Sequence, residues 1–271
     1  MIIQHNIAAI NSYRNLGVNQ SGLNKNLEKL SSGYRINRAG DDAAGLAISE
    51  KMRSQINGLN QATKNAQDAI GLIQTVEGAL TETHSMLQRL TTLASQSANG
   101  TYNTVARGNL DQEVQDLLKE IDRIADNTDF NGIKPIAATG TGNMTFQIGP
   151  SSGETLLLNA SNMTSTSIGV KSIDVTDRAG ANSAIDTIKN AIDKVSSYRA
   201  TLGAAQNRLE HTVNNLKVSS ENITAAESRI RDTDMADEIT AFTKNNILLQ
   251  ASQSMLAQSN SVPQSILSLL G

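Results

Sequence analysis

Apolar residues recur in steps of three and four along much of the chain, the spacing that places them on one face of an α-helix. One such run follows Met52 and comprises Ile56, Leu59, Ala62, Ala66, Ile70, Ile73, Val76, Leu80, Leu87 and Leu90. Further apolar residues at positions 69, 72, 79 and 86 make this stripe wider than the seam of a two-stranded coiled coil. The pattern predicts a long helix that packs against more than one partner helix.

A second long run keeps a heptad phase near the other end of the sequence. It comprises Ile185, Ile188, Ile192, Val195, Leu202, Leu209, Val213, Leu216, Ile223 and Ile230. At about 1.5 Å per residue this run predicts roughly 70 Å of helix. Polar residues at positions 199, 206 and 227 interrupt the seam, which weakens packing but helps to fix its register. A third helix is expected from about Thr104 to Ala125, after a turn at Asn99-Gly100.

The segment between the two helical arms has the pattern of strands and turns. Met144, Phe146 and Ile148 alternate with polar residues, and the alternation resumes at Leu156 after a Gly- and Ser-containing turn. This pattern predicts a β-hairpin from Met144 to Leu158. Prolines occur only at three positions, 135, 150 and 263, so both arms are long stretches without a helix breaker. The predicted fold is mainly α: a long antiparallel coiled-coil or helical-bundle rod formed by the N- and C-terminal arms, with a small β-hairpin region in the middle.

Both ends of the chain carry apolar stripes on short segments. The stripes comprise Ile7, Ile10, Leu16, Leu23, Leu27 and Leu30 at one end and Met235, Ile239, Phe242, Leu249, Leu256 and Leu270 at the other. Isolated helices of this length are only marginally stable in water, so we expect partners to order them. The ends are therefore predicted to drive polymerisation, because a contact between copies that does not close into a ring produces an open helical filament.

Composition and charge exclude several classes of protein. The chain has no Trp, only 3 Phe and 4 Tyr, which argues against a thick aromatic core. A net charge of −3 lacks the basic footprint of a nucleic-acid binder. The absence of cysteine removes disulfides and thiolate metal ligands. No apolar run approaches the roughly 18 residues of a membrane span, and the N-terminus does not resemble a cleaved signal peptide. The sequence predicts a soluble protein, or one that leaves the cell without such a signal.

Candidate catalytic and cofactor-binding residues are sparse. His5, His84 and His211 lie far apart and form no zinc-peptidase motif. The glycines at positions 33, 40 and 45 lack the spacing and the lysine of a phosphate-binding loop, and favour chain turns instead. Asp41-Asp42 could suggest acid–base chemistry, but a carboxylate pair before a helix is more typical of capping. We expect no catalytic residue, no metal and no cofactor.

Two long motifs resemble the signatures of bacterial flagellin. The first runs from Leu30 through Gly-Tyr-Arg-Ile-Asn-Arg-Ala-Gly-Asp-Asp to Glu50, and the tail contributes Glu227–Ala236 and Ala257–Leu270. The resemblance covers nearly the whole chain and is weakest from about Pro135 to Asp177. It implies filament-core terminal helices and a spoke in residues 1–42 and 231–271, and an outer-tube helical domain in residues 43–230 with a β-hairpin near 140–160. The short middle segment resembles a minimal flagellin that lacks the large variable surface domains.

The resemblance also implies a function. Flagellins are structural subunits of the bacterial flagellar filament, exported through a type III apparatus and assembled beneath a cap, with a junction to the hook and a cytosolic export chaperone as further partners. By analogy, the chaperone would bind the tail from Met235 to Leu270, and the protein would be extracellular. The residues expected to serve core assembly and chaperone binding are Ile7, Ile10, Leu23, Leu27, Leu30, Met235, Ile239, Phe242, Leu249, Leu256, Leu267 and Leu270.

Recognition by innate immune receptors is a further property that the resemblance implies. Gln88, Arg89, Leu93 and Glu113 match the positions read by Toll-like receptor 5 in the family. Many family members carry Arg-Glu immediately before the leucine, whereas this chain has Thr91-Thr92, which predicts weaker recognition. The leucine-rich tail, which includes Leu269, resembles the part that cytosolic inflammasome receptors sense.

A second function class competes with the filament subunit. Long heptad arms are also typical of a cytoplasmic coiled-coil scaffold that pairs with other proteins without polymerising. Such a scaffold does not need chain ends free of charge, whereas residues 259–271 contain no charged side chain. An enzyme ranks third, because no cluster of titratable residues accompanies a pocket-forming pattern.

Overall fold

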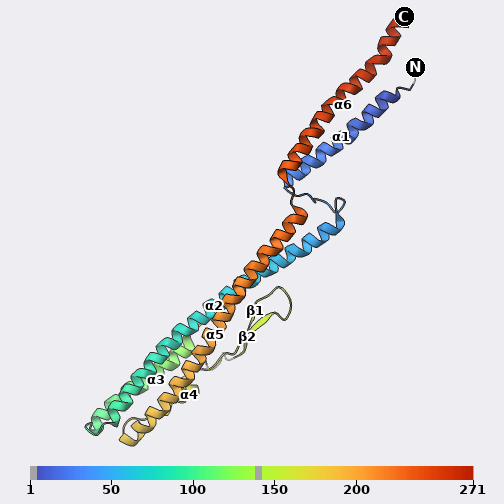
Figure 1. Ribbon diagram of the computed structural model, residues 1–271. Helices are drawn as coiled ribbons and strands as arrows, with labels where there is room; N and C mark the ends of the chain where they lie inside the picture. The colour runs from blue at the N-terminus through green and yellow to red at the C-terminus, as the bar shows by residue number, and fades with distance from the viewer. Residues whose placement is uncertain (1–4, 138–141, 271) are drawn as a thin grey trace. The chain divides into compact units, whose positions relative to one another are not determined.

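The computed structural model describes residues 5–137 and 142–270, excluding the side chains of residues 264 and 266–270. The described chain is mainly α-helical, as predicted, with one small antiparallel sheet (Figure 1). Its elements are α1 (Ile7–Ser32), α2 (Ala43–Ala98), α3 (Thr104–Asn127), β1 (Met144–Gln147), β2 (Thr155–Leu158), α4 (Ser165–Ile168), α5 (Arg178–Arg231) and α6 (Met235–Leu270). α2 begins nine residues before Met52 because a cap at Asp42 starts the helix there.

The chain divides into two units. The terminal unit contains residues 1–56 and 221–271, and the central unit contains residues 57–220. The division falls inside α2 and α5. Both helices run through the division without a break, so no linker marks it.

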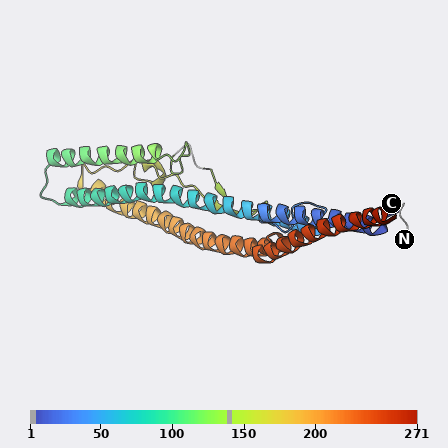
Figure 2. The same cartoon turned by 90° about the horizontal axis from the view of Figure 1, so that it is seen from above.

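Three helices of the central unit lie side by side (Figures 1 and 2). α5 runs antiparallel to α2: Ser220 bonds Asn60, and Arg199 approaches the carboxylate of Glu77 at 3.5 Å. α3 returns along α2, since Arg107 Nε donates to the carbonyl of Ser97 at 3.0 Å. The antiparallel pairing of the two long arms is thus confirmed within this unit.

Buried side chains from these helices form one hydrophobic core. The apolar stripe of α2 is wide because it faces both α3 and α5, and the additional positions Ala69 and Leu72 are buried there as predicted. The largest buried members are Ile73, Leu80, Leu87, Leu90 and Leu93 on α2, Val114 and Ile121 on α3, and Ile188, Leu202 and Leu209 on α5. Aliphatic residues supply most of this core, as the low aromatic content predicts.

The predicted β-hairpin is confirmed. β1 and β2 pair with Met144 opposite Leu158 and Gln147 opposite Thr155. Leu156 and Leu158 are buried in the core whereas Leu157 between them is exposed, the alternation that a half-buried strand requires. The turn between the strands contains Gly153 at φ +91°, a left-handed conformation that glycine adopts without strain.

Candidate functional site

α1 and α6 form an antiparallel pair within the terminal unit (Figure 1). Three asparagines mark the pairing, one at the N-cap of α1 and two within it. Asn6 Nδ2 donates to the carbonyl of Ser259 at 2.8 Å, Asn19 Nδ2 donates to Ser252 Oγ at 2.8 Å, and Asn26 faces Asn245. As the contacts move toward the C-terminal end of α1, they move toward the N-terminal end of α6. The start of α1 and the end of α6 therefore lie at the same end of the pair.

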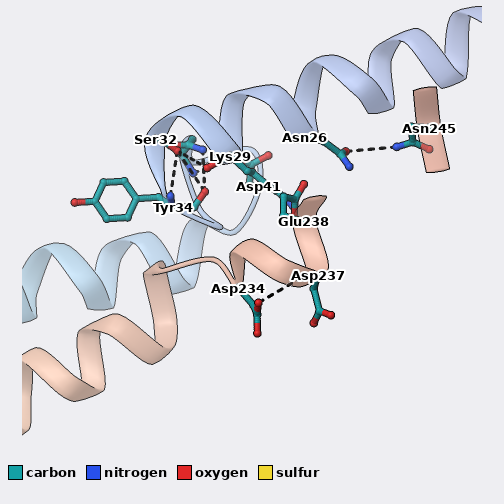
Figure 3. Close-up of polar contacts among 10 residues, drawn as sticks. Asn26, Lys29, Ser32, Tyr34, Asp41, Asp234, Asp237, Glu238 and Asn245 are labelled. Atoms are coloured by element: carbon teal, nitrogen blue, oxygen red, sulfur yellow. Dashed lines mark hydrogen bonds and ion pairs between the residues drawn. The ribbon is translucent and has the colours of Figure 1, made fainter. Parts of the chain in front are cut away.

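The close approach of the two helices occurs near Asn26, the one polar side chain that the structure describes as buried in this pair. With its amide turned to satisfy both atoms, Asn26 accepts from the backbone N–H of Phe242 at 2.9 Å and donates to the carbonyl of Gly22 at 2.6 Å. A Cβ on Gly22 would lie 3.1 Å from the Asn245 amide. Figure 3 shows Asn26 and Asn245 facing each other, with Lys29 and Glu238 one turn further along at 3.7 Å. A buried amide of this kind fixes the register of a helix pair.

The predicted assembly residues fall into two groups. Leu23 and Leu30 of α1 and Phe242, Leu249 and Leu256 of α6 are partly buried. Heptad spacing places the three residues of α6 beside the polar contacts to α1. The second group is exposed to solvent and comprises Ile7, Ile10, Leu27, Met235 and Ile239. Leu267 and Leu270 lie outside the described side chains.

Further exposed apolar residues on these helices were missed by the sequence analysis. They comprise Tyr13, Val18, Ile247, Leu248, Met255 and Val262, and Ile247 is 61% exposed. A search for heptad spacing finds the stripe that faces the partner helix, but it does not find these positions because they lie outside that stripe. The signal that could have found them is the absence of any charged residue after Lys244. A shallow groove of about 460 Å³ lies among them on α6, lined by Ile239, Thr243 and Ile247 and by Thr240, Lys244 and Leu248.

The connection between α1 and α2 is tied to the end of α5 through Arg231. Its guanidinium lies 4.7 Å from the centroid of the Tyr34 ring, and Nη1 donates to Glu50 at 2.6 Å. The hydrogen bond from Arg231 is the main cause that lowers the pKa of the Glu50 carboxyl below its usual value. Arg35 adds two bonds to this end of α5: its N–H donates to the carbonyl of Arg231 at 2.7 Å and its guanidinium to that of Ile230 at 2.6 Å.

Capping side chains set where the neighbouring helices begin. Asp42 accepts from the backbone N–H of Gly45 at 2.9 Å and so caps α2, which confirms the capping interpretation for this member of the acidic pair. Asp41 accepts from the N–H of Arg38 at 3.1 Å, and this bond is the main cause that lowers the pKa of its carboxyl. At the other junction Asp234 caps α6 by accepting from the N–H of Ala236 at 2.8 Å; Figure 3 shows its bond to Asp237.

Three of the four residues predicted to contact a receptor are brought to the surface of the central unit. Arg89 and Glu113 form an ion pair of 2.7 Å between α2 and α3. Gln88 is exposed beside them and bonds His84 Nε2 at 3.0 Å. The expectation for Leu93 needs a correction, because its side chain is 0% exposed. Position 93 lies on the face of α2 that packs into the core, so this leucine is not available for direct contact.

Comparison of the sequence with known proteins identifies the family. The model of the bacterial flagellin N-terminal helical region matches residues 3–141, and that of the C-terminal helical region matches residues 185–270. The chain belongs to the flagellin family. A flagellin from Halalkalibacterium halodurans is 54% identical over 272 aligned positions that span all of both chains. A flagellin from Clostridium tyrobutyricum is 41% identical, but its alignment extends over 378 positions and covers 97% of this chain.

Solved structures agree with the flagellin assignment. The crystal structure of Bacillus cereus flagellin matches with a TM-score of 0.53 at 36% identity, covering 60% of this chain and 94% of that one. Members of the flagellin family are structural proteins, so the chain is not an enzyme. No group of three or more potential metal ligands occurs in the described residues. Nor does any helix in the described ranges have the length and apolar character that a membrane span requires.

Proposed function

We propose that the chain is the subunit of a bacterial flagellar filament and that copies join through the α1–α6 pair. Among the relatives, a protein of Treponema phagedenis that is 48% identical over the full chain is called a flagellar filament 33 kDa core protein. The observation that carries the proposal is that apolar side chains occupy most of the circumference of α6, beyond the side where Asn245, Ser252 and Ser259 contact α1. The paired helix α1 covers only part of that circumference.

The distribution around α6 follows from helical geometry. At about 100° per residue, the three partly buried residues Phe242, Leu249 and Leu256 fall within about 40° of the circumference. The exposed apolar residues spread over about 220° on the remaining surface. A helix that is apolar all round is typically buried on all sides. α1 covers one side, so neighbouring copies are the simplest cover for the rest.

Charge supports the same arrangement. The part of α6 after Lys244 has no charged residue, and the part of α1 before Arg14 has none either. Burying an unpaired charge is costly, so a surface intended for burial avoids charges. A two-helix pair buries little apolar surface by itself, and association with other copies would offset the entropy lost when the ends become ordered.

The remaining partners belong to the same proposal. They are export by the flagellar type III apparatus, a chaperone on Met235–Leu270, and contacts with the cap and the hook junction, and membership of the flagellin family supports them. Because the copies would polymerise outside the cell, the protein would be extracellular. The exposed apolar side of α6, including the groove at Ile239 and Ile247, offers a chaperone a surface that filament neighbours would otherwise cover.

Toll-like receptor 5 is proposed as an external partner through Gln88, Arg89 and Glu113. The ion pair between Arg89 and Glu113 already engages both charges, and Thr91-Thr92 supplies none, which supports weak recognition. Substituting Arg89→Ala should reduce the response of a receptor reporter cell line while leaving the helical circular dichroism spectrum unchanged. An undiminished response would refute this contact.

Seeded polymerisation tests the main proposal. The full chain and a chain lacking residues 236–271 are purified, seeded with filament fragments and examined by electron microscopy. Long filaments from the full chain alone are expected, because the truncation removes α6. If the full chain stays in solution as dispersed particles under conditions that assemble the flagellin of Bacillus subtilis, which is 50% identical, the proposal is refuted.

A further inference from the structure

α6 contains a proline inside the helix, at Pro263. Proline has no backbone N–H, so the carbonyl four residues earlier loses its intrahelical partner. That carbonyl belongs to Ser259. A carbonyl left open in a surface intended for burial costs free energy unless another donor reaches it.

The donor comes from the other end of the chain. Asn6 Nδ2 donates to the Ser259 carbonyl at 2.8 Å, across 253 residues of sequence. The same side chain caps α1, because Asn6 Oδ1 accepts from the backbone N–H of Ala9 at 3.0 Å. One amide therefore satisfies an open N–H of α1 and the open carbonyl of α6 at once.

We propose that Asn6 couples the ordering of the two chain ends and thereby determines whether they enter the filament as a pair. This inference rests on the proposed function and specifies how its assembly surface is completed. The amide is suited to the task because it offers an acceptor and a donor at fixed separation. An aspartate in its place would still cap α1 but could not donate to α6.

The position of the contact explains its importance for assembly. Terminal helical turns fray unless they are tied down. The Asn6 contact lies at the first turn of α1 and close to the end of α6, where both helices are free of acidic and basic side chains. Ser259 Oγ adds a longer contact of 3.4 Å to Asn6 Oδ1. Losing the donor therefore loosens both ends together.

A double-mutant cycle tests the coupling. The full chain, Asn6→Asp, Pro263→Ala and the double variant are compared by their critical concentrations for seeded polymerisation. Asn6→Asp should raise the critical concentration about two- to tenfold, the factor that one net hydrogen bond corresponds to. In the Pro263→Ala background the N–H of residue 263 serves Ser259, so the same change should have an effect of less than about twofold.

Equal effects of Asn6→Asp in both backgrounds would overturn the proposal, because any general effect of the new charge cancels in the cycle. Hydrogen exchange at the first turn of α1 in the soluble chain supplies a second readout that does not depend on polymerisation. Asn6→Asp should lower protection in the unmodified chain and change it little in the Pro263→Ala background, where the Ser259 carbonyl already has a donor. If the unmodified chain did not polymerise, the proposed function would fail, and hydrogen exchange would still decide the role of Asn6.

Discussion

At the scale of single residues, the terminal unit is held by a few side chains that each serve two segments. Arg231 stacks on Tyr34 and bonds Glu50, so the end of α5, the loop after α1 and the start of α2 meet at one guanidinium. The Arg231 side chain is only 12% exposed, which shields the contact from water, whereas Glu50 remains half exposed. The resulting stabilisation is modest and depends on the charge of Glu50.

The lowered pKa of Glu50 predicts an acid-sensitive contribution to stability. Because the folded-state pKa lies below the unfolded one, the stabilisation is complete above the unfolded value, about 4.5, and is lost as the pH falls through the folded value. Arg231→Gln should therefore lower the melting temperature at pH 6, and the difference from the unmodified chain should narrow at pH 3. Calorimetry at both values measures this. A gap as wide at pH 3 as at pH 6 would contradict it.

Burial of Leu93 predicts a stability effect where the family motif suggests a receptor contact. Leu93→Ala should lower the free energy of unfolding of the central unit by about 2–5 kcal/mol, the range for a fully buried leucine. Urea unfolding followed by circular dichroism measures the change. The matched control is Val105→Ala, whose side chain is 74% exposed and which should stay within about 0.5 kcal/mol. Similar losses in both variants would refute the assignment of Leu93 to the core.

At the scale of elements, the helices differ in what their apolar faces require. The apolar stripe of α2 in the central unit is buried within the chain, against α3, α5 and the hairpin. The apolar residues of α6 that face away from α1, such as Ile247 and Met255, are not covered by the described chain. The hairpin reaches α2 through its turn, where Pro150 lies against Gly58, and Asn65 Nδ2 donates to the carbonyl of Gln147 at 3.1 Å.

Two glycines in α2 predict opposite outcomes for the same substitution. Gly78→Ala should stabilise the central unit by about 0.5–1 kcal/mol, because nothing lies within 4 Å of the new Cβ and alanine favours helix. Gly58→Ala should not give this gain, since its Cβ would lie 2.8 Å from Pro150 Cβ and push the hairpin away. Thermal unfolding of both variants checks the prediction, which fails if Gly58→Ala stabilises as much as Gly78→Ala.

How much of these elements could be predicted depended on the period of the pattern. The third helix and the hairpin were found within a few residues, because Leu110 to Ile124 and Met144 to Leu158 keep clear periods. The exposed residues of α6 could not be found in this way, since a helix covered from several directions has no single stripe. The contact between Asn6 and Ser259 was also missed, because pairing across the chain leaves no local signal.

At the scale of the whole molecule, folding depends on the buried core, whereas assembly is proposed to depend on the exposed apolar residues of α6. Ile247→Asp should leave the fold of the soluble chain nearly unchanged, because the side chain is already exposed. It should abolish filament growth, since burying an unpaired carboxylate in the contact costs several kcal/mol. Sedimentation after seeding measures assembly, and circular dichroism confirms folding. Val105→Asp, at an exposed apolar position in the central unit, is the control. Normal growth of Ile247→Asp filaments would refute the assigned interface.

The return of α6 along α1 has a practical consequence for engineering. Because the start of α1 and the end of α6 lie at one end of a pair that copies are proposed to cover, a tag or cargo fused to either terminus would have to fit inside the assembled particle. The turn at Ser151–Gly153 is exposed and joins two short strands. Exposed turns tolerate insertions well. A foreign epitope placed there should be displayed on every subunit, which makes the middle of this chain, and not its ends, the place to carry a payload.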